Sequence, residues 1–429
     1  MPDRPLRVGL AGVGNVGSAL ARLLAGNGGG FPGRRPQIVA YSARSPGDRG
    51  LPLEGAEYFA DAAEMAARAE IDVFVELIGG AGGVPFAAVK AALARGLSVV
   101  TANKAMLSSH GLELAELAER SGAPLAFEAA VGGGVPIIKV LREALAGNRI
   151  QRVSGILNGT CNYILSKMET ERLPFDVCLE EAQRLGYAEA DPTFDVGGFD
   201  TAHKLSILAS IAFGVRIDAG AVSVEGIENI TLADLVAADE LGFRIKLLGV
   251  AARTDHGVEQ RVHPTMVGKS APLAQTMGVL NAVTIDGDAV GQLTLVGPGA
   301  GGAATASAVA ADLADIARGA VAPAFGRPVA ALAEGERASL QRHEGGYYVR
   351  LSVLDRPGSM ATIARRMADR SISLESVVQK RAGNDASSHV AVVIVTHATT
   401  ETSIREALAL TVQDGVAREK PQVIRIERP

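Results

Sequence analysis

A glycine turn near the N-terminus restricts the possible folds of this chain more than any other feature. In LRVGLAGVGNVGSALARLL, an apolar run typical of a buried strand leads into the turn, and an Ala/Leu-rich helix follows it. Gly12, Gly14 and Gly17 have the GxGxxG spacing, which permits a tight turn, a close approach of the backbone to a pyrophosphate, and packing of the helix on the strand. Between a strand and a helix, this spacing predicts a dinucleotide-binding α/β domain rather than a turn alone.

The next strand, QIVAYSAR, bears on the choice of dinucleotide. A domain that selects NAD usually carries Asp or Glu at the end of this strand, but this chain has Ser42, Ala43 and Arg44 there. Because arginine can pair with a 2′-phosphate, the sequence favours NADP and leaves NAD possible. Arg44 could also be an ordinary surface arginine.

Two further apolar segments, IDVFVELIGG and LSVVTANKAML, lack polar alternation and predict strands of a parallel sheet that is covered on both faces. Thr101 and Lys104 follow at the carboxyl end of the second strand, which is the ligand-binding edge in doubly wound sheets. Lys104 is therefore either a ligand-facing residue or a solvated loop lysine. The later segment GPGAGGAATASAVAADLADIARG predicts a glycine turn and a helix, residues 299–320, that returns the chain to this domain.

The stretch GYAEADPTFDVGGFDTAHK concentrates charge ahead of an apolar run that ends at Val215. That run is too short to cross a bilayer and predicts a buried helix. Asp200 and Lys204 are spaced i, i+4 at its start, so they share one face, and Glu189 and Asp195 precede them. The pattern fits a structural ion pair or a functional pair brought into an apolar interior, because both arrangements perturb titration.

The segment FEAAVGGGVPII combines Glu128 with three consecutive glycines. Such a loop can turn several carbonyls toward one centre, and hard cations prefer oxygen ligands, but the same loop could be a plain domain hinge. A second domain begins with RIQRVSGILNGTCNYILSKM. From Asp218 to about Val296, the pattern predicts alternating short strands and helices without evident chemistry.

The C-terminal segment predicts a separate unit with the order βαββαβ, which is a ferredoxin-like arrangement. Residues 321–345, which include VAPAFGRPVA, predict a linker to this unit. The chain is thus expected to form a first domain of residues 1–135 completed by 299–320, a second of 136–298, and a third of 346–429.

Composition and charge exclude several classes of protein. With 429 residues, 48% apolar and 4% aromatic, the chain should form two or three α/β domains. The net charge of -5, without a Lys/Arg cluster, argues against nucleic acid as a partner and favours a small metabolite. No apolar run reaches the length of a membrane span. Cys161 and Cys178 lack ligand spacing and the first strand begins at Leu6, too early for a signal peptide, so a cytoplasmic protein is expected.

In combination, these segments resemble homoserine dehydrogenases that carry a C-terminal ACT domain. The resemblance runs essentially from end to end, through the ordered motifs GVGNVG, YSAR, ELIGG, TANKA, FEAAVGGGVPI, GILNGTCNYIL, GYAEADPTFDVGGFDTAHK, GPGAGGAATASAV and LDRPGSM. Two positions depart from the family pattern, since Ala304 replaces a common proline and Cys161 a common hydroxyl residue. The resemblance implies a Rossmann-type doubly wound domain, an α+β substrate-binding and dimerisation domain, and a ferredoxin-like ACT domain.

The implied reaction interconverts L-homoserine and L-aspartate 4-semialdehyde with NAD(P). Hydride transfer builds charge on the aldehyde oxygen, so a proton donor must lie there. By resemblance, Lys204 is this acid, and the base in the reverse direction, while Asp200 orients its ammonium group. Glu189 matches the residue that holds the substrate amino group, with help from Asp195, and Lys104 lies near the nicotinamide and the substrate carboxylate. The cofactor contacts implied in the same way are Val13, Asn15, Val16, Arg44, Lys104, Gly186 and Gly301.

The resemblance also implies a structural monovalent cation, sodium-like, at the domain junction. Its ligands would be Glu128 and the carbonyls of Val131, Gly133 and Val135. Because ACT domains usually pair across chains and bind amino acids there, we expect a homodimer or homotetramer that is feedback-controlled by an amino acid, with threonine as the favoured effector. The enzyme would act in threonine, methionine and isoleucine biosynthesis.

Two alternatives stay open from the residues alone. One is another NAD(P)-dependent dehydrogenase of a small amino acid or semialdehyde, although phosphorylating oxidation would need a catalytic cysteine, and neither Cys161 nor Cys178 has an evident activating partner. The other is a dinucleotide-binding regulator that senses amino acids through its tail. A regulator would not explain why Asp200 and Lys204 enter an apolar helix beside Glu189.

Overall fold

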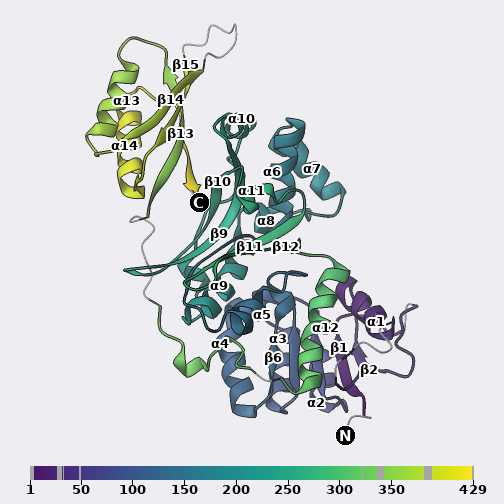
Figure 1. Ribbon diagram of the computed structural model, residues 1–429. Helices are drawn as coiled ribbons and strands as arrows, with labels where there is room; N and C mark the ends of the chain where they lie inside the picture. The colour runs from purple at the N-terminus through teal and green to yellow at the C-terminus, as the bar shows by residue number, and fades with distance from the viewer. Residues whose placement is uncertain are drawn as a thin grey trace.

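The computed structural model describes residues 4–26, 31, 33–47, 50–320, 322–335, 343–380 and 389–427. Figure 1 shows an N-terminal part in purple and blue, a middle part in teal and a C-terminal part in yellow, with the green helix α12 lying against the N-terminal part. Within the described ranges, none of the helices is long and apolar enough to cross a membrane.

The N-terminal part is built on a parallel sheet of order β3-β2-β1-β4-β5-β6. Its strands are β1 (Leu6–Ala11), β2 (Pro36–Ser42), β3 (Glu57–Phe59), β4 (Val73–Glu76), β5 (Ser98–Thr101) and β6 (Leu125–Ala126). Its helices are α1 (Asn15–Gly26), α2 (Ala62–Arg68), α3 (Val84–Ala94) and α4 (Lys104–Ser121), followed by the short turns η1 (Glu128–Ala130), α5 (Ile137–Lys139) and η2 (Val140–Ala144). All four residues of β4 are buried, as a strand covered on both faces requires. The predicted doubly wound fold is confirmed.

Helix α12 (Gly302–Arg318) returns to this sheet from far along the chain. Its Val309 and Leu313 belong to the same buried apolar cluster as Leu10 of β1 and Leu20 of α1. A Cβ at Gly302 would lie 2.9 Å from the carbonyl oxygen of Asn15, so only glycine lets the two helices begin this close together. The N-termini of α1 and α12 therefore lie side by side.

The middle part is a mixed sheet with helices packed on it. Its strands are β7 (Ile150–Ile156), β8 (Ser223–Val224), β9 (Phe243–Thr254), β10 (Gly257–Gly268), β11 (Leu280–Gly287) and β12 (Gly291–Pro298). Its helices are α6 (Gly159–Glu171), α7 (Phe175–Arg184), α8 (Thr193–Val196), α9 (Phe199–Phe213), η3 (Ala219–Ala221), α10 (Leu232–Glu240) and α11 (Pro272–Gln275). Where the sequence predicted short alternating elements, β9 and β10 form one antiparallel hairpin of two 12-residue strands. The predicted buried helix is α9, which contacts β7, β9 and β10 on one side and α4 on another.

The C-terminal part has the predicted order βαββαβ, with one additional two-residue strand ahead of its second helix. Its elements are β13 (Glu344–Leu354), α13 (Ser359–Ala368), β14 (Leu374–Lys380), β15 (His389–Thr396), β16 (Thr399–Thr400), α14 (Glu401–Gln413) and β17 (Gln422–Glu427). Its sheet continues into the middle part, because β17 also pairs in parallel with β10 over three residues. The two parts therefore share one eleven-stranded sheet, in which β10 and β17 are neighbours.

Ion pairs reinforce the seam between β10 and β17. Arg350 of β13 donates to both carboxylate oxygens of Asp234 at 2.6 and 3.0 Å, and Asp234 is fully buried at the start of α10. Glu427 of β17 pairs with Arg261 of β10 at 2.7 Å and with Arg152 of β7 at 2.8 Å. Charges from both parts thus neutralise one another around the buried Asp234 and Arg261, so removing the partner of either residue would leave a buried charge.

Part of the predicted linker 321–345 packs tightly on the N-terminal part. Residues 322–335 include the turn η4 (Val329–Ala331), and the fully buried Phe325 meets the Phe127 ring at a centroid distance of 5.4 Å. The Val329 amide donates to the Glu119 carboxylate at 2.9 Å. Residues 321 and 336–342 of the predicted linker lie outside the described residues.

Candidate functional site

The glycine turn between β1 and α1 has the geometry of a pyrophosphate-binding turn. Gly12 has a φ of 97°, and a Cβ there would lie 2.6 Å from the Leu77 carbonyl oxygen. A Cβ at Gly17 would collide with the Gly12 carbonyl, whereas Gly14 has no such neighbour within 4 Å among the residues that the structure describes. The first and third glycines thus serve the turn and the packing, and the second leaves space for a ligand beside the start of α1.

A cavity of about 500 Å³ opens at this turn. It is lined by Gly12, Val13, Gly14, Ser42, Ala43, Arg44, Ala60, Ala62, Leu77, Ile78 and Val84. Arg44 is exposed just beyond β2, while Asn15 and Val16 begin α1 and Gly301 precedes α12. Two helix N-termini and one arginine therefore meet at the carboxyl edge of the sheet, an arrangement that favours anions.

Glu76, which sequence reasoning did not assign to the site, organises the loop beside this cavity. Its carboxylate accepts from the Ile78 and Gly79 amides at 2.8 and 2.9 Å and from the Thr101 hydroxyl at 2.6 Å. Thr101 is thus fully buried against the Glu76 carboxylate. A carboxylate at the end of an apolar strand was the available signal for this role.

The charged cluster forms at the start of α9. The helix begins after Gly198, whose φ of 87° lies in the left-handed region that favours glycine. Asp200 is 4% exposed and Lys204 9%. The Lys204 ammonium donates to Asp200 Oδ2 at 2.8 Å and to the Leu157 carbonyl at 2.7 Å. The predicted i, i+4 pair is therefore confirmed as a buried contact.

Lys104 connects the N-terminal part to this cluster through an ion pair with Asp200. It is the first residue of α4, which Asn103 caps by accepting from the Met106 amide at 3.0 Å. Its ammonium lies 3.1 Å from Asp200 Oδ1, so Asp200 stands between two lysines from different parts of the chain. Burial alone would raise the pKa of Asp200, but Lys204 and Lys104 together hold it well below its usual range.

Asp195 lies next to Asp200 and behaves differently. It belongs to α8, and its Oδ1 accepts from Asn158 Nδ2 at 2.8 Å. Burial raises the pKa of Asp195, and the Asp200 charge adds to this shift, while the Asn158 hydrogen bond opposes it. The two neighbouring carboxylates are therefore shifted in opposite directions.

Gly186 and Glu189 lie in the loop between α7 and α8. Gly186 has a φ of 76°, and the next residue, Tyr187, accepts a hydrogen bond from the Thr160 hydroxyl at 2.7 Å through its carbonyl. Glu189 is exposed, and among the described residues its carboxylate makes no hydrogen bond or ion pair. The loop is thus tied to α6, but Glu189 is not brought into the Asp200–Lys204 contact.

Four predicted cation ligands lie in one buried loop: Glu128, Val131, Gly133 and Val135. The Glu128 carboxylate accepts from the amides of Ile138 and Lys139 at 2.9 and 2.8 Å. Burial raises the pKa of Glu128 despite these two amides, so a cation beside it would stabilise its charged form. The ligand set is all oxygen with one carboxylate, which suits a hard cation. No group of three or more His, Cys, Asp or Glu among the described residues could hold a metal ion.

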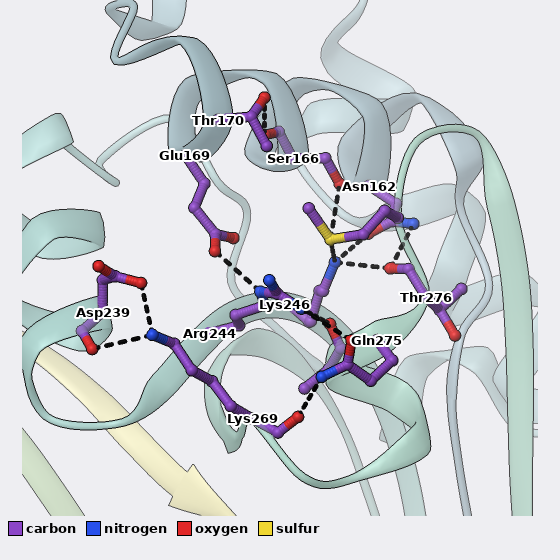
Figure 2. A network of polar contacts seen from close by, with 12 residues as sticks. Asn162, Ser166, Glu169, Thr170, Asp239, Arg244, Lys246, Lys269, Gln275 and Thr276 are labelled. Atoms are coloured by element: carbon purple, nitrogen blue, oxygen red, sulfur yellow. Dashed lines mark hydrogen bonds and ion pairs between the residues drawn. The ribbon is translucent and has the colours of Figure 1, made fainter.

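A buried lysine, Lys246, holds α6 in place through Asn162, as Figure 2 shows. Lys246 of β9 donates to Asn162 Oδ1 at 2.9 Å and to the Thr276 carbonyl at 2.7 Å. Asn162 in turn donates to the carbonyls of Thr276 and Leu280 at 3.2 and 3.0 Å. Burial lowers the pKa of Lys246 to about 8. This network fixes α6, whose N-terminus faces the charged cluster.

Family models match most of the chain. The model of the homoserine dehydrogenase NAD-binding domain matches residues 12–128, that of homoserine dehydrogenase matches 136–314, and that of the ACT domain matches 347–410. A homoserine dehydrogenase from Pseudomonas aeruginosa is 42% identical over 424 residues, which cover 96% of this chain and 97% of that protein. One from Mycobacterium tuberculosis is 40% identical over 440 residues, covering 99% and 98%.

Solved structures give the same result. The crystal structure of a homoserine dehydrogenase from Thiobacillus denitrificans matches with a TM-score of 0.91 at 40% identity, over 99% of this chain and 98% of that one. A hyperthermophilic archaeal homoserine dehydrogenase in complex with NADPH matches with a TM-score of 0.63 at 28% identity, over 72% of this chain and 97% of that one.

Proposed function

The chain belongs to the homoserine dehydrogenase family, and from this premise we propose which residues carry the family reaction, the nicotinamide-dependent interconversion of L-homoserine and L-aspartate 4-semialdehyde. One observation carries the proposal: a buried ammonium group, that of Lys204, is held by Asp200 and the Leu157 carbonyl. Lys104 connects this contact to the carboxyl edge of the first sheet. The proton-transfer group and the cofactor edge therefore meet at Asp200.

Lys204 is the proposed proton donor to the aldehyde oxygen and the proton acceptor in the reverse direction. An ammonium group has three N–H donors, and two of those on Lys204 are directed at Asp200 and Leu157. The third can meet the substrate oxygen, on which negative charge grows during reduction. The bound nicotinamide supplies or accepts the hydride. Asp200 keeps Lys204 in place without itself taking part in hydride transfer.

Glu189, Asp195 and Lys104 are the proposed contacts to the two ends of the amino acid. The carboxylates of Glu189 and Asp195 suit the substrate ammonium group, and the Lys104 ammonium suits the substrate carboxylate. The proposed cofactor contacts surround the cavity and its helix N-termini: Gly12, Val13, Gly14, Asn15, Val16, Gly17, Arg44, Lys104, Gly186 and Gly301. Thr101 belongs to this set only through the loop that Glu76 holds.

The test is homoserine-dependent reduction of NADP and of NAD, followed by absorbance of the reduced nicotinamide. We expect turnover that is faster with NADP, because Arg44 lines the cavity where a 2′-phosphate would lie. Lys204→Ala should abolish turnover while dinucleotide binding is retained. Lys269→Ala, which removes a partly exposed lysine paired with Asp239, is the matched control and should keep turnover. Normal turnover in Lys204→Ala would refute the proposed role.

A structural monovalent cation at Glu128 is part of the same proposal. Exchange of sodium for choline at constant ionic strength should lower the melting temperature, because choline is too large to be bound by Glu128 and the loop carbonyls. The chemical step should change less than the stability. Identical melting curves in the two salts would count against the cation.

The proposal divides the chain at about residues 135, 298 and 345, and assigns residues 346–429 to amino-acid sensing. Threonine is the proposed effector, in a cytoplasmic homodimer or homotetramer that acts in threonine, methionine and isoleucine biosynthesis. Inhibition should be measured on the intact chain, because removing β17 would also open the sheet at β10. If threonine does not inhibit the intact enzyme, the ACT domain binds a different effector.

A further inference from the structure

The Asn158 side chain lies between two carboxylates of the charged cluster. Its Nδ2 donates to Asp195 Oδ1 at 2.8 Å and to Asp200 Oδ2 at 2.9 Å, and its Oδ1 accepts from the Cys161 amide at 2.8 Å. The reversed amide would place its oxygen against both carboxylates and its NH₂ group against an N–H. Only the observed orientation satisfies the neighbours, so both amide protons of Asn158 are bound to carboxylates.

Helix capping alone does not explain an asparagine at this position. Asn158 is the N-cap of α6, and aspartate or serine would cap the helix about as well. Only an amide can accept the capping hydrogen bond and also donate two hydrogen bonds to anions. An aspartate would cap α6 but would set a third carboxylate against Asp195 and Asp200.

We propose that Asn158 is a positioning residue for the reaction. It fixes the Asp195 and Asp200 carboxylates relative to each other and so keeps Asp200 Oδ2 within hydrogen-bonding distance of the Lys204 ammonium group. The inference rests on the proposed roles of Asp200 and Lys204. Asp200 Oδ2 accepts from both Asn158 and Lys204, at 2.9 and 2.8 Å, so a displaced Asp200 would also displace the proton donor. The two donors on Asn158 also offset the repulsion between two carboxylates that share a buried site.

Contacts other than the Asn158 cap also hold α6 in place. One turn further along, Asn162 is bonded to Lys246 and to the carbonyls of Thr276 and Leu280, as Figure 2 shows for Lys246 and Thr276. Replacing Asn158 should therefore disturb the carboxylates before it disturbs the helix. Asn162 also provides a matched control, because it is a second buried amide on the same helix.

The test compares Asn158→Asp, Asn158→Ser and Asn158→Ala with the wild type, using kcat/KM for homoserine as a function of pH. If Asn158 positions the carboxylates, Asn158→Asp should be the most impaired, by about 100-fold or more, with the acidic limb moved upward by about one pH unit. Asn158→Ser should lose about 10-fold, because its hydroxyl keeps the cap but offers one O–H donor in place of the two N–H donors. If Asn158 only caps α6, Asp and Ser should match the wild type and only Ala should lose activity, which overturns the proposal.

Asn162→Asp is the control for a buried amide-to-acid change and should alter the melting temperature without moving the acidic limb. A wild type without turnover, or an active Lys204→Ala variant, would refute the proposed function instead. With an active wild type and an inactive Lys204→Ala, wild-type pH profiles in both Asn158→Asp and Asn158→Ser refute the role of Asn158 alone. If Asn158→Asp does not fold, Asn158→Ser decides by the same criteria.

Discussion

Replacing Asp200 by asparagine should destabilise the protein at neutral pH, whereas the same replacement at Asp195 should not. Burial alone would raise the pKa of Asp200, but Lys204 and Lys104 hold it below the unfolded value of about 3.9, so its charge contributes stability that is complete at neutral pH and lost as the pH falls through the folded pKa. Burial raises the pKa of Asp195 above its unfolded value, so the ionised Asp195 costs stability at neutral pH.

The magnitude follows from burial and from the contacts that are lost. Removing one partner of a buried ion pair costs about 3–5 kcal/mol. Asp200 is 4% exposed and contacts the Lys204 and Lys104 ammonium groups at 2.8 and 3.1 Å. Lys104 is a third exposed and its share is screened, so Lys204 dominates the loss. At roughly 2–4 °C per kcal/mol for a domain of this size, Asp200→Asn should melt on the order of 10 °C lower.

Scanning calorimetry of the wild type, Asp200→Asn and Asp195→Asn at neutral pH, without cofactor, measures the contrast. The free energy of unfolding of Asp195→Asn should be within about 1 kcal/mol of the wild-type value or slightly higher, since its Oδ1 can still accept a hydrogen bond from Asn158. Activity would not separate the two variants, because both carboxylates belong to the proposed site. Equal losses in the two variants, or a larger loss in Asp195→Asn, would refute the reasoning.

Three further predictions concern the seam, the buried lysine and the cofactor. Arg350→Ala should cost about 3–5 kcal/mol of stability by leaving Asp234 buried without its partner, and Arg366→Ala, which breaks a more exposed Arg–Asp pair, should cost much less in the same calorimetry. Burial lowers the pKa of Lys246 to about 8, so its charge costs stability below that pH and the cost vanishes toward about pH 10.4. The wild type should therefore gain up to about 3 kcal/mol relative to Lys246→Met between those pH values in urea unfolding, and a constant difference would contradict this. Arg44→Ala should reduce kcat/KM about 10- to 100-fold with NADP and leave that with NAD nearly unchanged, whereas equal losses would exclude a 2′-phosphate contact.

The parts of the fold that sequence could predict are those whose signals are local. The glycine spacing of the first turn, the order of elements in the tail and the i, i+4 spacing of Asp200 and Lys204 each describe neighbours along the chain. The hairpin of β9 and β10 was missed because β10 carries Pro264 and the buried charges of Glu259 and Arg261, which hide a strand pattern.

The contacts that sequence could not predict join residues far apart in the chain. The pairing of β10 with β17 links residues 265–267 to 425–427, and no local pattern encodes it. Asn158 meets Asp195 and Asp200 only after α6, α8 and α9 have packed together. An asparagine directly ahead of a helix indicates a cap and nothing about these two carboxylates.

The shared sheet also sets an order of events during synthesis of the chain. Strand β10 ends at residue 268, but its neighbour β17 begins only at residue 422. At about 5–20 residues per second, a ribosome needs roughly 10–30 s to cover that interval. During this time, part of one edge of β10 lacks its strand partner β17, and Arg261 lacks its ion pair with Glu427. A nascent chain interrupted before β17 would leave Thr265 to Val267 without strand partners on that edge, and an unpaired strand edge is prone to pair with another chain.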